Sequence, residues 1–569
     1  MPPTLRRLLP RPWTTVVLTV VASVCVVTLF SVVVPYDMDE FIYYNIIACR
    51  AYPGNDINGH CDPHALNVLG TGLVLPLRSF LYVGSIPALY YLPLWLLWKS
   101  PLSARLVSWL FLMGGAALFA RAFRFPFAVT AVLFSLFFPY AFQHLVDTGP
   151  VGPQICTVYA LYILIDRWCS TLRWRYALGS AVVMFLGIWI KLSYFWFAPG
   201  IAIFFVIACI RHRRILLRRG ACSRLAIQSI VAILVCAGMA GSYIFSTHPL
   251  QGNERPLLTQ LLQSQMFSIR EILHGALWHT RAFEYLLHPL EATQRIYYVS
   301  PLDPLWQYYY VLLFLFVPAF LILSLVLWKK EKEMREYVLM SIALFIAFLL
   351  TVAMVARTKN AVCMHHIILT FPFLLLAIGA AVKGLLVVKG RRVRPFVRSV
   401  TGLWLLLFLA LNVRYFMVFP RQNLIPSRHS SKEVLRKVLL DPTVARNSMV
   451  VAADWGFHYF QALYGDPEQS VVLHERLRDP VAIRWWKQLA ADNGRRVIFM
   501  MTKPDAERIR TFVSTVQLER CTAVPLDAPW QMFSEPDPAV RQRCEEVRRM
   551  LADGATFGEW FSNRLFLAF

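Results

Sequence analysis

The chain has 569 residues, of which 57% are hydrophobic and only 16% are charged, and its mean hydropathy is +0.52. This composition excludes a water-soluble globular protein and predicts a polytopic α-helical membrane protein. The formal net charge of +24 would also suit a nucleic-acid-binding protein. The basic residues, however, stand in short clusters between apolar runs, as loops on the cytoplasmic side of a membrane do. We therefore expect membrane lipid as a partner and no nucleic acid.

Near the N-terminus, the segment 14–34 is apolar and is long enough to cross a membrane. It lacks a small-residue cleavage site, so we interpret it as a retained signal anchor. The stretch 35–44 follows directly and contains Asp37, Asp39 and Glu40. Because a carboxylate beside a membrane is costly unless it faces water or a partner, this acidic triplet is the first candidate for a functional site.

Apolar stretches of roughly 20 residues are the candidates for membrane spans. About eleven occur, at 14–34, 102–120, 125–143, 154–168, 176–190, 194–210, 225–246, 307–328, 337–356, 367–388 and 399–419. This arrangement places all the basic clusters between them on the side of the N-terminus. The outer side receives the loops 36–101 and 247–306 and everything after residue 420. The division agrees with the positive-inside rule throughout.

Residues 80–98 are also apolar, but counting them as a span would place most basic clusters outside. Pro87, Pro93 and many Tyr and Trp residues in this stretch are typical of a helix at the membrane interface. We therefore predict a juxtamembrane or re-entrant helix here. A hairpin formed with 64–79 would preserve the same topology.

The segment after residue 420 is polar and alternates strand-like with helix-like patterns. The strand-like runs are 448–454, 470–475 and 495–501, and the helical patterns are 480–492 and 503–515. This alternation predicts a small extracytoplasmic α/β domain at 421–569, following a transmembrane domain at 1–420.

Two cysteine pairs fall in segments predicted to lie outside. Cys49 and Cys61 flank a polar loop, and Cys521 and Cys544 lie in the tail. Each pair could form a disulfide in an oxidising compartment, and four unrelated thiols fit the pattern equally well.

In the predicted topology, several acidic and basic residues lie at the outer ends of spans. These residues are Asp39, Glu40, Asp147, Lys191, Arg357, Lys359, His365 and His366. A carboxylate can act as general base on an acceptor hydroxyl, and cations can stabilise a departing phosphate. No charge stands in the middle of a confident span, which argues against a transport site near the bilayer midplane.

Individual members of this group have plain structural explanations too. Lys191 can snorkel from a helix end, and Arg357 and Lys359 can cap a short turn. Asp147 precedes Thr-Gly-Pro, which suits a turn. Neighbouring histidines point to different helix faces, so the pair 365–366 is not expected to share a metal ion.

These features resemble the GT-C class of membrane glycosyltransferases, specifically the protein O-mannosyltransferases and the aminoarabinose transferases of lipid A. Asp39-Glu40 matches their Asp-Glu motif at the start of a long first outer loop. The segment LYYLPLWLLWKSPLSARLVSWL, including Arg105, resembles their approach to the second span. Asp147 stands where they have a second outer acid, and Lys191 matches a phosphate-proximal lysine. The stretch HHIILTFPF recurs in bacterial relatives, whereas YVGSIP replaces a Pro-Pro signature.

The resemblance implies a GT-C-like hexosyl or pentosyl transferase that uses a polyprenyl-phosphate sugar donor. It would move the sugar, with inversion, to a hydroxyl of a glycolipid or protein on the periplasmic side of a bacterial inner membrane. Asp39 and Glu40 would be catalytic, and Asp147, Lys191, Arg357, Lys359, His365 and His366 would bind substrate. No metal ligand is assigned and no cofactor is certain. Whether the protein needs a divalent metal ion stays open.

Two other classes of protein remain open from the sequence. A flippase or transporter for lipid-linked oligosaccharides would need a water-filled cavity that reaches the bilayer midplane. A scaffold or sensor would carry its ligand site in the tail, within 448–515.

Overall fold

The computed structural model describes the helical part of the chain at residues 83–97, 101–136, 149–246, 332–356 and 369–387. It also describes short strands and single residues near positions 20, 322 and 395–410. The predicted spans at 14–34, 307–328 and 399–419 and the loop 247–306 lie wholly or largely outside the described residues, as do Cys49, Cys61 and Cys544.

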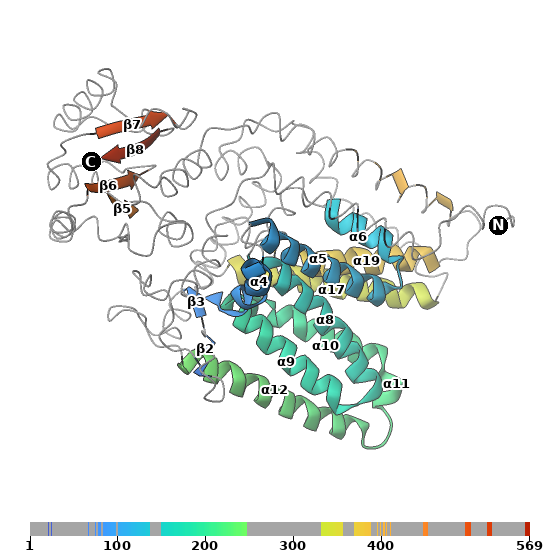
Figure 1. Cartoon of the computed structure of the whole chain (residues 1–569). Helices are drawn as coiled ribbons and strands as arrows, with labels where there is room; N and C mark the ends of the chain where they lie inside the picture. Colours follow the sequence, from blue (N-terminus) through green and yellow to red (C-terminus); the bar gives the residue numbers. More distant parts are fainter. Residues whose placement is uncertain are drawn as a thin grey trace. The chain divides into compact units, whose positions relative to one another are not determined.

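The described helices occur in chain order as labelled in Figure 1. They are α4 (Ile86–Leu97), α5 (Pro101–Phe123), α6 (Phe127–Leu136), α8 (Val151–Thr171), α9 (Trp174–Ile190), the 3-10 helix η3 (Leu192–Phe197), α10 (Ala198–Arg211), α11 (Arg213–Leu216), α12 (Ala221–Ser246), α17 (Lys332–Ala356) and α19 (Phe371–Val387). Every one of them from α5 onward, except the single turn of α11, falls on a predicted span.

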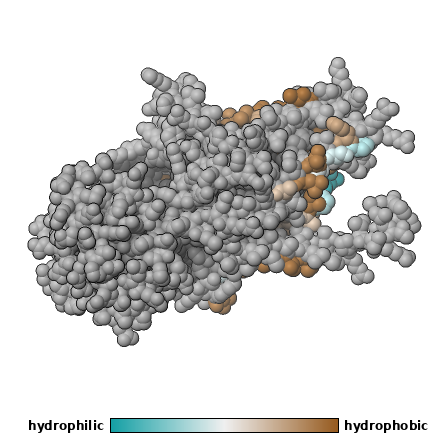
Figure 2. All heavy atoms as spheres, turned by 90° about the horizontal axis from the view of Figure 1, so that it is seen from above, coloured by the Kyte–Doolittle hydropathy of each residue, from teal (hydrophilic) through white to brown (hydrophobic). Residues whose placement is uncertain are grey.

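Four helical stretches among the described residues are long and apolar enough to cross a membrane. They are Arg105–Phe123, Leu192–Arg211, Ala221–Ile244 and Met334–Val355, and Trp174–Ile190 and Phe371–Val387 are shorter apolar helices. On α12, Ile227, Ile230 and Ile233 are 57%, 58% and 66% exposed. Figure 2 shows that brown, hydrophobic residues make up most of the surface that is coloured. Exposed apolar helix faces of this kind fit lipid, not water.

Contacts between α8, α9, α10 and α12 fix the directions in which these helices run. Gln154 at the start of α8 hydrogen-bonds to the carbonyl of Lys191, just past the end of α9. Arg211 at the end of α10 meets Asp166 near the end of α8. Gln228 near the start of α12 accepts a hydrogen bond from Trp168, also near the end of α8. Each of these helices is therefore antiparallel to the one before it.

Further contacts fix the directions of α5, α17 and α19. Phe119 and Phe123 of α5 lie against Tyr159 and Tyr162 of α8, so α5 and α8 run in parallel. Phe373 at the start of α19 packs on Phe197 and Phe204, which places the starts of α10 and α19 together. The Ser341 hydroxyl of α17 donates to the Ala377 carbonyl of α19, and Tyr337 lies at Gly384, so α17 and α19 are antiparallel.

The helix α4 is the apolar stretch that the charge pattern excluded as a span. It has 12 residues with Pro93 inside it, which gives a length of roughly 18 Å at 1.5 Å per residue. A hydrocarbon core of about 30 Å is too thick for a helix of that length. Its length fits the predicted juxtamembrane or re-entrant helix, and its position relative to a membrane stays a prediction.

The C-terminal part of the chain contributes a four-stranded sheet with the order β5-β6-β8-β7. The strands are β5 (Ser448–Ala452), β6 (Arg496–Met501), β7 (Cys521–Pro525) and β8 (Arg564–Ala568). β5 and β6 are parallel, and β8 pairs antiparallel with β6 and β7. The predicted strands at 448–454 and 495–501 coincide with β5 and β6. The run 470–475 and both helical patterns lie outside the described residues, so the α/β domain stays a prediction.

The elements belong to two compact units. The helices and β4 (Val83–Gly84) belong to one, and the short strands β1 (Leu66–Asn67), β2 (Val74–Leu75) and β3 (Arg78–Phe80) belong with β5–β8 to the other. All the site residues discussed below that are described lie in the helical unit.

Replacing Gln228 with Leu should destabilise the helical unit. The Gln228 side chain is fully buried, accepts a bond from Trp168 Nε1 at 2.8 Å and donates one to the Leu172 carbonyl at 2.8 Å. A leucine leaves the Trp168 N–H and the Leu172 carbonyl buried without this partner, at a cost of about 1–3 kcal/mol for each group. Thermal unfolding in detergent should show a clearly lower midpoint. The neighbouring change Ser229→Ala removes only a bond within α12 and should shift the midpoint little. Equal effects of the two substitutions would contradict this role for Gln228.

Candidate functional site at the Lys191 end of the helices

The alternating helix directions give the helical unit two ends that differ in charge. One end, which we call the arginine end, carries exposed arginines at positions 121, 124, 167, 173, 175, 211, 213, 214, 218, 219, 224 and 335. The other, the Lys191 end, gathers the starts of α5, α8, η3 and α19 and the ends of α9, α12 and α17. Among the described residues of the helical unit, its basic side chains are Arg105 and Lys191, and both are buried.

Lys191 interrupts the chain between α9 and η3. Its backbone is extended, with φ −162° and ψ 132°, so α9 cannot continue through it. Gln154 Nε2 donates to the Lys191 carbonyl oxygen at 3.2 Å, and the Tyr194 backbone N–H donates to the same oxygen at 2.9 Å. Lys191 is 5% exposed. A lysine that snorkelled into water would be far more exposed, so its low exposure does not favour snorkelling.

The segment before α4 lies directly against the end of α9. A Cβ on Gly84 would collide with the backbone carbonyl of Trp189, two residues before Lys191. Only glycine lets the two backbones approach this closely. Ser85 follows and is fully buried. The segment before α4 therefore brings Gly84 and Ser85 to the Lys191 end.

Arg105 is the largest fully buried side chain of the described residues, at 1% exposed. It stands one helical turn before Ser108 on α5, so the two side chains share a face of the helix. The Tyr91 hydroxyl lies 2.7 Å from Ser108 Oγ and donates to the Gly149 carbonyl at 3.4 Å. Thus α4 and the entry to α8 both cross the face of α5 that carries Arg105.

Several buried polar atoms at this end have no hydrogen-bond partner among the described residues. They are Ser85 Oγ, Trp109 Nε1, Gln154 Oε1 and Ser193 Oγ. Buried polar groups are nearly always paired, so unpaired ones call for an explanation such as a bound ligand or water. Because two buried cations, Arg105 and Lys191, lie at the same end, the Lys191 end is the best candidate for a polar ligand site.

Most of the predicted site residues lie outside the described part of the chain. These are Asp39, Glu40, Asp147, Arg357, Lys359, His365 and His366. Some of their described neighbours in sequence do lie at the Lys191 end. Gly149 accepts the bond from Tyr91, Ala356 ends α17, and Thr370 immediately precedes α19. Of the predicted site residues the structure therefore describes only Lys191, and all the assignments, that of Lys191 included, stay predictions.

Arg105 is the candidate that the sequence reasoning did not select as a site residue. It appeared there only within the segment that resembles the approach to a second span. The available signal was an arginine inside an otherwise apolar helix, because such a charge is rare in a membrane span and usually functional.

The described residues give little information on a metal ion. They contain no group of three His, Cys, Asp or Glu side chains arranged to hold one. The predicted acids and histidines lie outside this search, so the need for a divalent metal ion stays open.

Together, the apolar helices and their exposed apolar faces define the described part as a helical membrane protein. Comparison with models of known protein families finds no match. Comparison with curated proteins also finds none. The family resemblance therefore rests on the motifs given above.

Replacing Gly84 with Ala should damage the Lys191 end. The new Cβ would have to displace the Trp189 backbone, and overpacking of this kind costs about 1–3 kcal/mol. We expect a lower unfolding midpoint in detergent together with reduced activity. Gly238→Ala is the matched control, since nothing lies within 4 Å of a Cβ there, and alanine in a helix should be neutral or stabilising. A Gly84→Ala protein as stable as the Gly238→Ala protein would contradict the close approach.

Proposed function

We propose that this chain is a membrane glycosyltransferase that moves a sugar from a polyprenyl-phosphate donor to an acceptor hydroxyl. The observation that carries the proposal is the pair of buried cations, Arg105 and Lys191, beside unpaired buried polar atoms at one end of an apolar helical unit. Such a site suits an anionic group held at headgroup depth, because the lipid part of the donor can stay in the bilayer. Lys and Arg are the side chains that bind phosphate most strongly.

The orientation follows from the distribution of charge. The arginine end is strongly basic, and loops rich in Lys and Arg stay in the cytoplasm. The Lys191 end then faces the outside, which in a bacterial inner membrane is the periplasm. The C-terminal segment would lie on that same side.

The roles of the predicted residues follow from the chemistry of transfer. Asp39 takes the proton of the acceptor hydroxyl, with Glu40 and Asp147 supporting it. The acceptor oxygen attacks the anomeric carbon, the bond from that carbon to the phosphate oxygen breaks, and the configuration inverts. Polyprenyl phosphate leaves with the electron pair. Its charge is stabilised by Lys191, Arg105, Arg357, Lys359 and the histidines at 365 and 366.

Mass analysis of glycolipids and glycoproteins in a deletion strain tests this function. We expect one sugar modification to disappear from a lipid or protein acceptor and to return with the wild-type gene. An unchanged set of glycolipids and glycoproteins would contradict the proposal. Loss of all glycans built from one lipid-linked precursor, with that precursor accumulating, would favour a flippase.

Cysteine labelling tests the orientation separately. Cys222 is exposed at the arginine end, and a cysteine introduced by Ser514→Cys reports on the tail. A membrane-impermeant maleimide added to intact spheroplasts should label the tail cysteine and leave Cys222 unlabelled until the membrane is opened, as read by peptide mass spectrometry. The reverse pattern would place the Lys191 end in the cytoplasm.

A further inference from the structure

The arginine end contains an excess of positive charge that the proposed glycosyl transfer does not use. Between residues 167 and 224 nine arginines are exposed, at positions 167, 173, 175, 211, 213, 214, 218, 219 and 224. The same segment and its edge contain one acid, Asp166. Of the nine, only Arg211 forms an ion pair among the described residues. The other cations are therefore available to an anionic partner.

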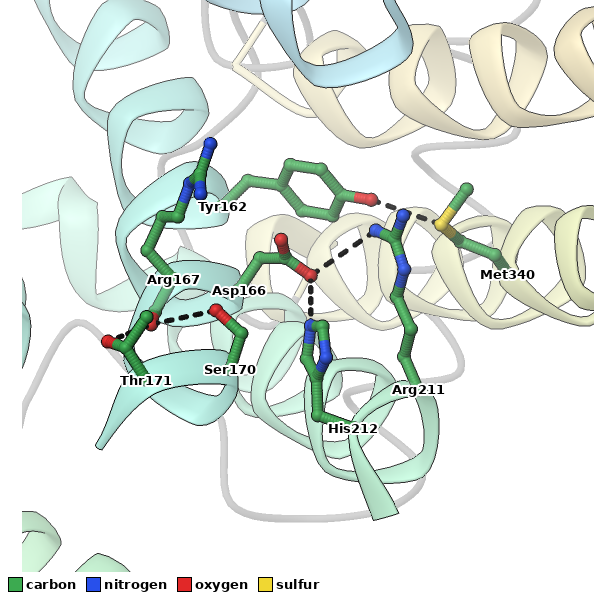
Figure 3. A network of polar contacts seen from close by, with 8 residues as sticks. All are labelled: Tyr162, Asp166, Arg167, Ser170, Thr171, Arg211, His212 and Met340. Atoms are coloured by element: carbon green, nitrogen blue, oxygen red, sulfur yellow. Dashed lines mark hydrogen bonds and ion pairs between the residues drawn. The ribbon is translucent and has the colours of Figure 1, made fainter. Parts of the chain in front are cut away.

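These arginines occur in two connections between helices, including the helix ends, and we call these connections the two loops: residues 167–175, from α8 to α9, and residues 211–224, from α10 to α12. The fold holds the two loops together. Figure 3 shows Arg211, the last residue of α10, and His212, which follows it, pointing at Asp166 of α8, with Arg167 next to Asp166. Asp166 Oδ1 lies 3.2 Å from Arg211 Nη1 and 2.9 Å from His212 Nε2. This contact fixes the end of α10 beside the end of α8.

A second contact, between Leu172 and Gln228, joins the first of these loops to α12. Gln228 of α12 donates to the carbonyl of Leu172, the residue immediately before Arg173. Arg224 stands one turn before Gln228 on α12. The loop after α8 and the start of α12 thus present Arg173 and Arg224 close to one buried hydrogen-bonded contact, which holds their backbones in place.

Apolar side chains adjoin this basic surface. Trp174 and Leu178 near the start of α9 are 40% and 39% exposed, and Ile227 and Ile230 on α12 are 57% and 58% exposed. A surface that is basic at its edge and apolar along the adjoining helices matches a molecule with an anionic head and hydrocarbon tails. A soluble polyanion would leave the apolar part unused.

We infer that the loops around Arg173 and Arg224 form a binding site for an anionic phospholipid. The headgroup phosphate binds the arginines of the two loops, and the acyl chains lie along the exposed faces of α9 and α12. Guanidinium groups suit this role because they bind phosphate through two parallel hydrogen bonds. The site is independent of the proposed glycosyl transfer, which is at the opposite end of the helices.

Native mass spectrometry of the full chain in a neutral detergent tests the site. Dioleoyl phosphatidylglycerol should bind more tightly than dioleoyl phosphatidylcholine. In the double variant Arg173→Gln/Arg224→Gln, the affinity for phosphatidylglycerol should fall about 30-fold, since each arginine near anionic lipid contributes about a factor of five. Affinity for phosphatidylcholine, whose phosphate charge is balanced by its choline, should fall much less. The lipid-free melting temperature should stay near that of the wild type.

The matched control is Arg121→Gln/Arg124→Gln, which removes two exposed charges from the same end but from the last turn of α5 and the residue after that helix. It should weaken phosphatidylglycerol binding much less. Equal losses in both double variants would overturn the site in favour of diffuse attraction. Displacement of the lipid by an equal concentration of inorganic phosphate would overturn the lipid as its occupant. If the first variant unfolds, Arg213→Gln/Arg219→Gln, between α10 and α12, replaces it. This variant should lower the affinity for phosphatidylglycerol to the same extent.

Discussion

Replacing Asp39 with Asn should lower the rate of sugar transfer by about 10²–10⁴-fold, the usual contribution of a general base. The amide keeps the size of the carboxylate but cannot accept the proton of the acceptor hydroxyl. Donor binding should change little, because the donor phosphate is assigned to cations and not to this acid. Transfer assays in membranes that contain equal amounts of each protein measure the effect.

The neighbouring acid provides the matched control for this substitution. Asp37 lies two residues earlier in the same stretch but outside the Asp-Glu pair that resembles the family motif. Asp37→Asn should therefore retain most of the activity. Intact transfer in Asp39→Asn, or an equal loss in both variants, would show that Asp39 is not the base.

Replacing Lys191 with Gln should lower transfer by about 10²–10³-fold, the range found when one stabilising group is removed from a developing negative charge. Lys191 is 5% exposed, so solvent does not screen its charge as it would on a surface. The effect should be seen in kcat/KM for the donor, because the phosphate carries more charge in the transition state than in the bound donor.

The structural role of this position can be separated from its charge. The Lys191 carbonyl, not its side chain, accepts the bonds from Gln154 and Tyr194, so glutamine leaves both bonds in place. The unfolding midpoint should consequently stay close to that of the wild type. Lys383→Gln removes the same charge from α19, where Lys383 lies over the Phe125 ring at 5.7 Å, and should keep full activity. A Lys191→Gln protein that transfers sugar normally would remove Lys191 from the site.

The helix positions were the part of the fold most readable from the sequence. Long apolar runs bounded by arginine clusters predicted α8, α9, α10 and α12 to within a few residues. The interruption at Lys191 was also predicted, since one polar residue between two apolar runs marks the end of a span. Hydropathy works here because every buried backbone group in a membrane must be paired within a helix.

Features that depend on contacts between distant segments could not be predicted. Arg105 is buried although it lies near the start of its helix, and no local pattern in the sequence indicates this. The contacts of Tyr91 with Ser108 and Gly149 on the same side of α5 are equally invisible in the local sequence. The need for glycine at position 84 arises only because Trp189 lies against it. Strands β7 and β8 are short and show no clear alternation of apolar and polar residues. Their partners lie far away in the sequence, since Phe499 of β6 pairs with Ala568 of β8, 69 positions later.

The most direct test of the central claim is release of polyprenyl phosphate from a purified polyprenyl-phosphate sugar by the full chain in lipid vesicles. We expect release in step with glycosylation of an acceptor hydroxyl, dependence on Asp39 and Lys191, and inversion at the anomeric carbon. Movement of the intact donor across the bilayer without cleavage, unaffected by Asp39→Asn, would contradict the transferase and identify a transporter.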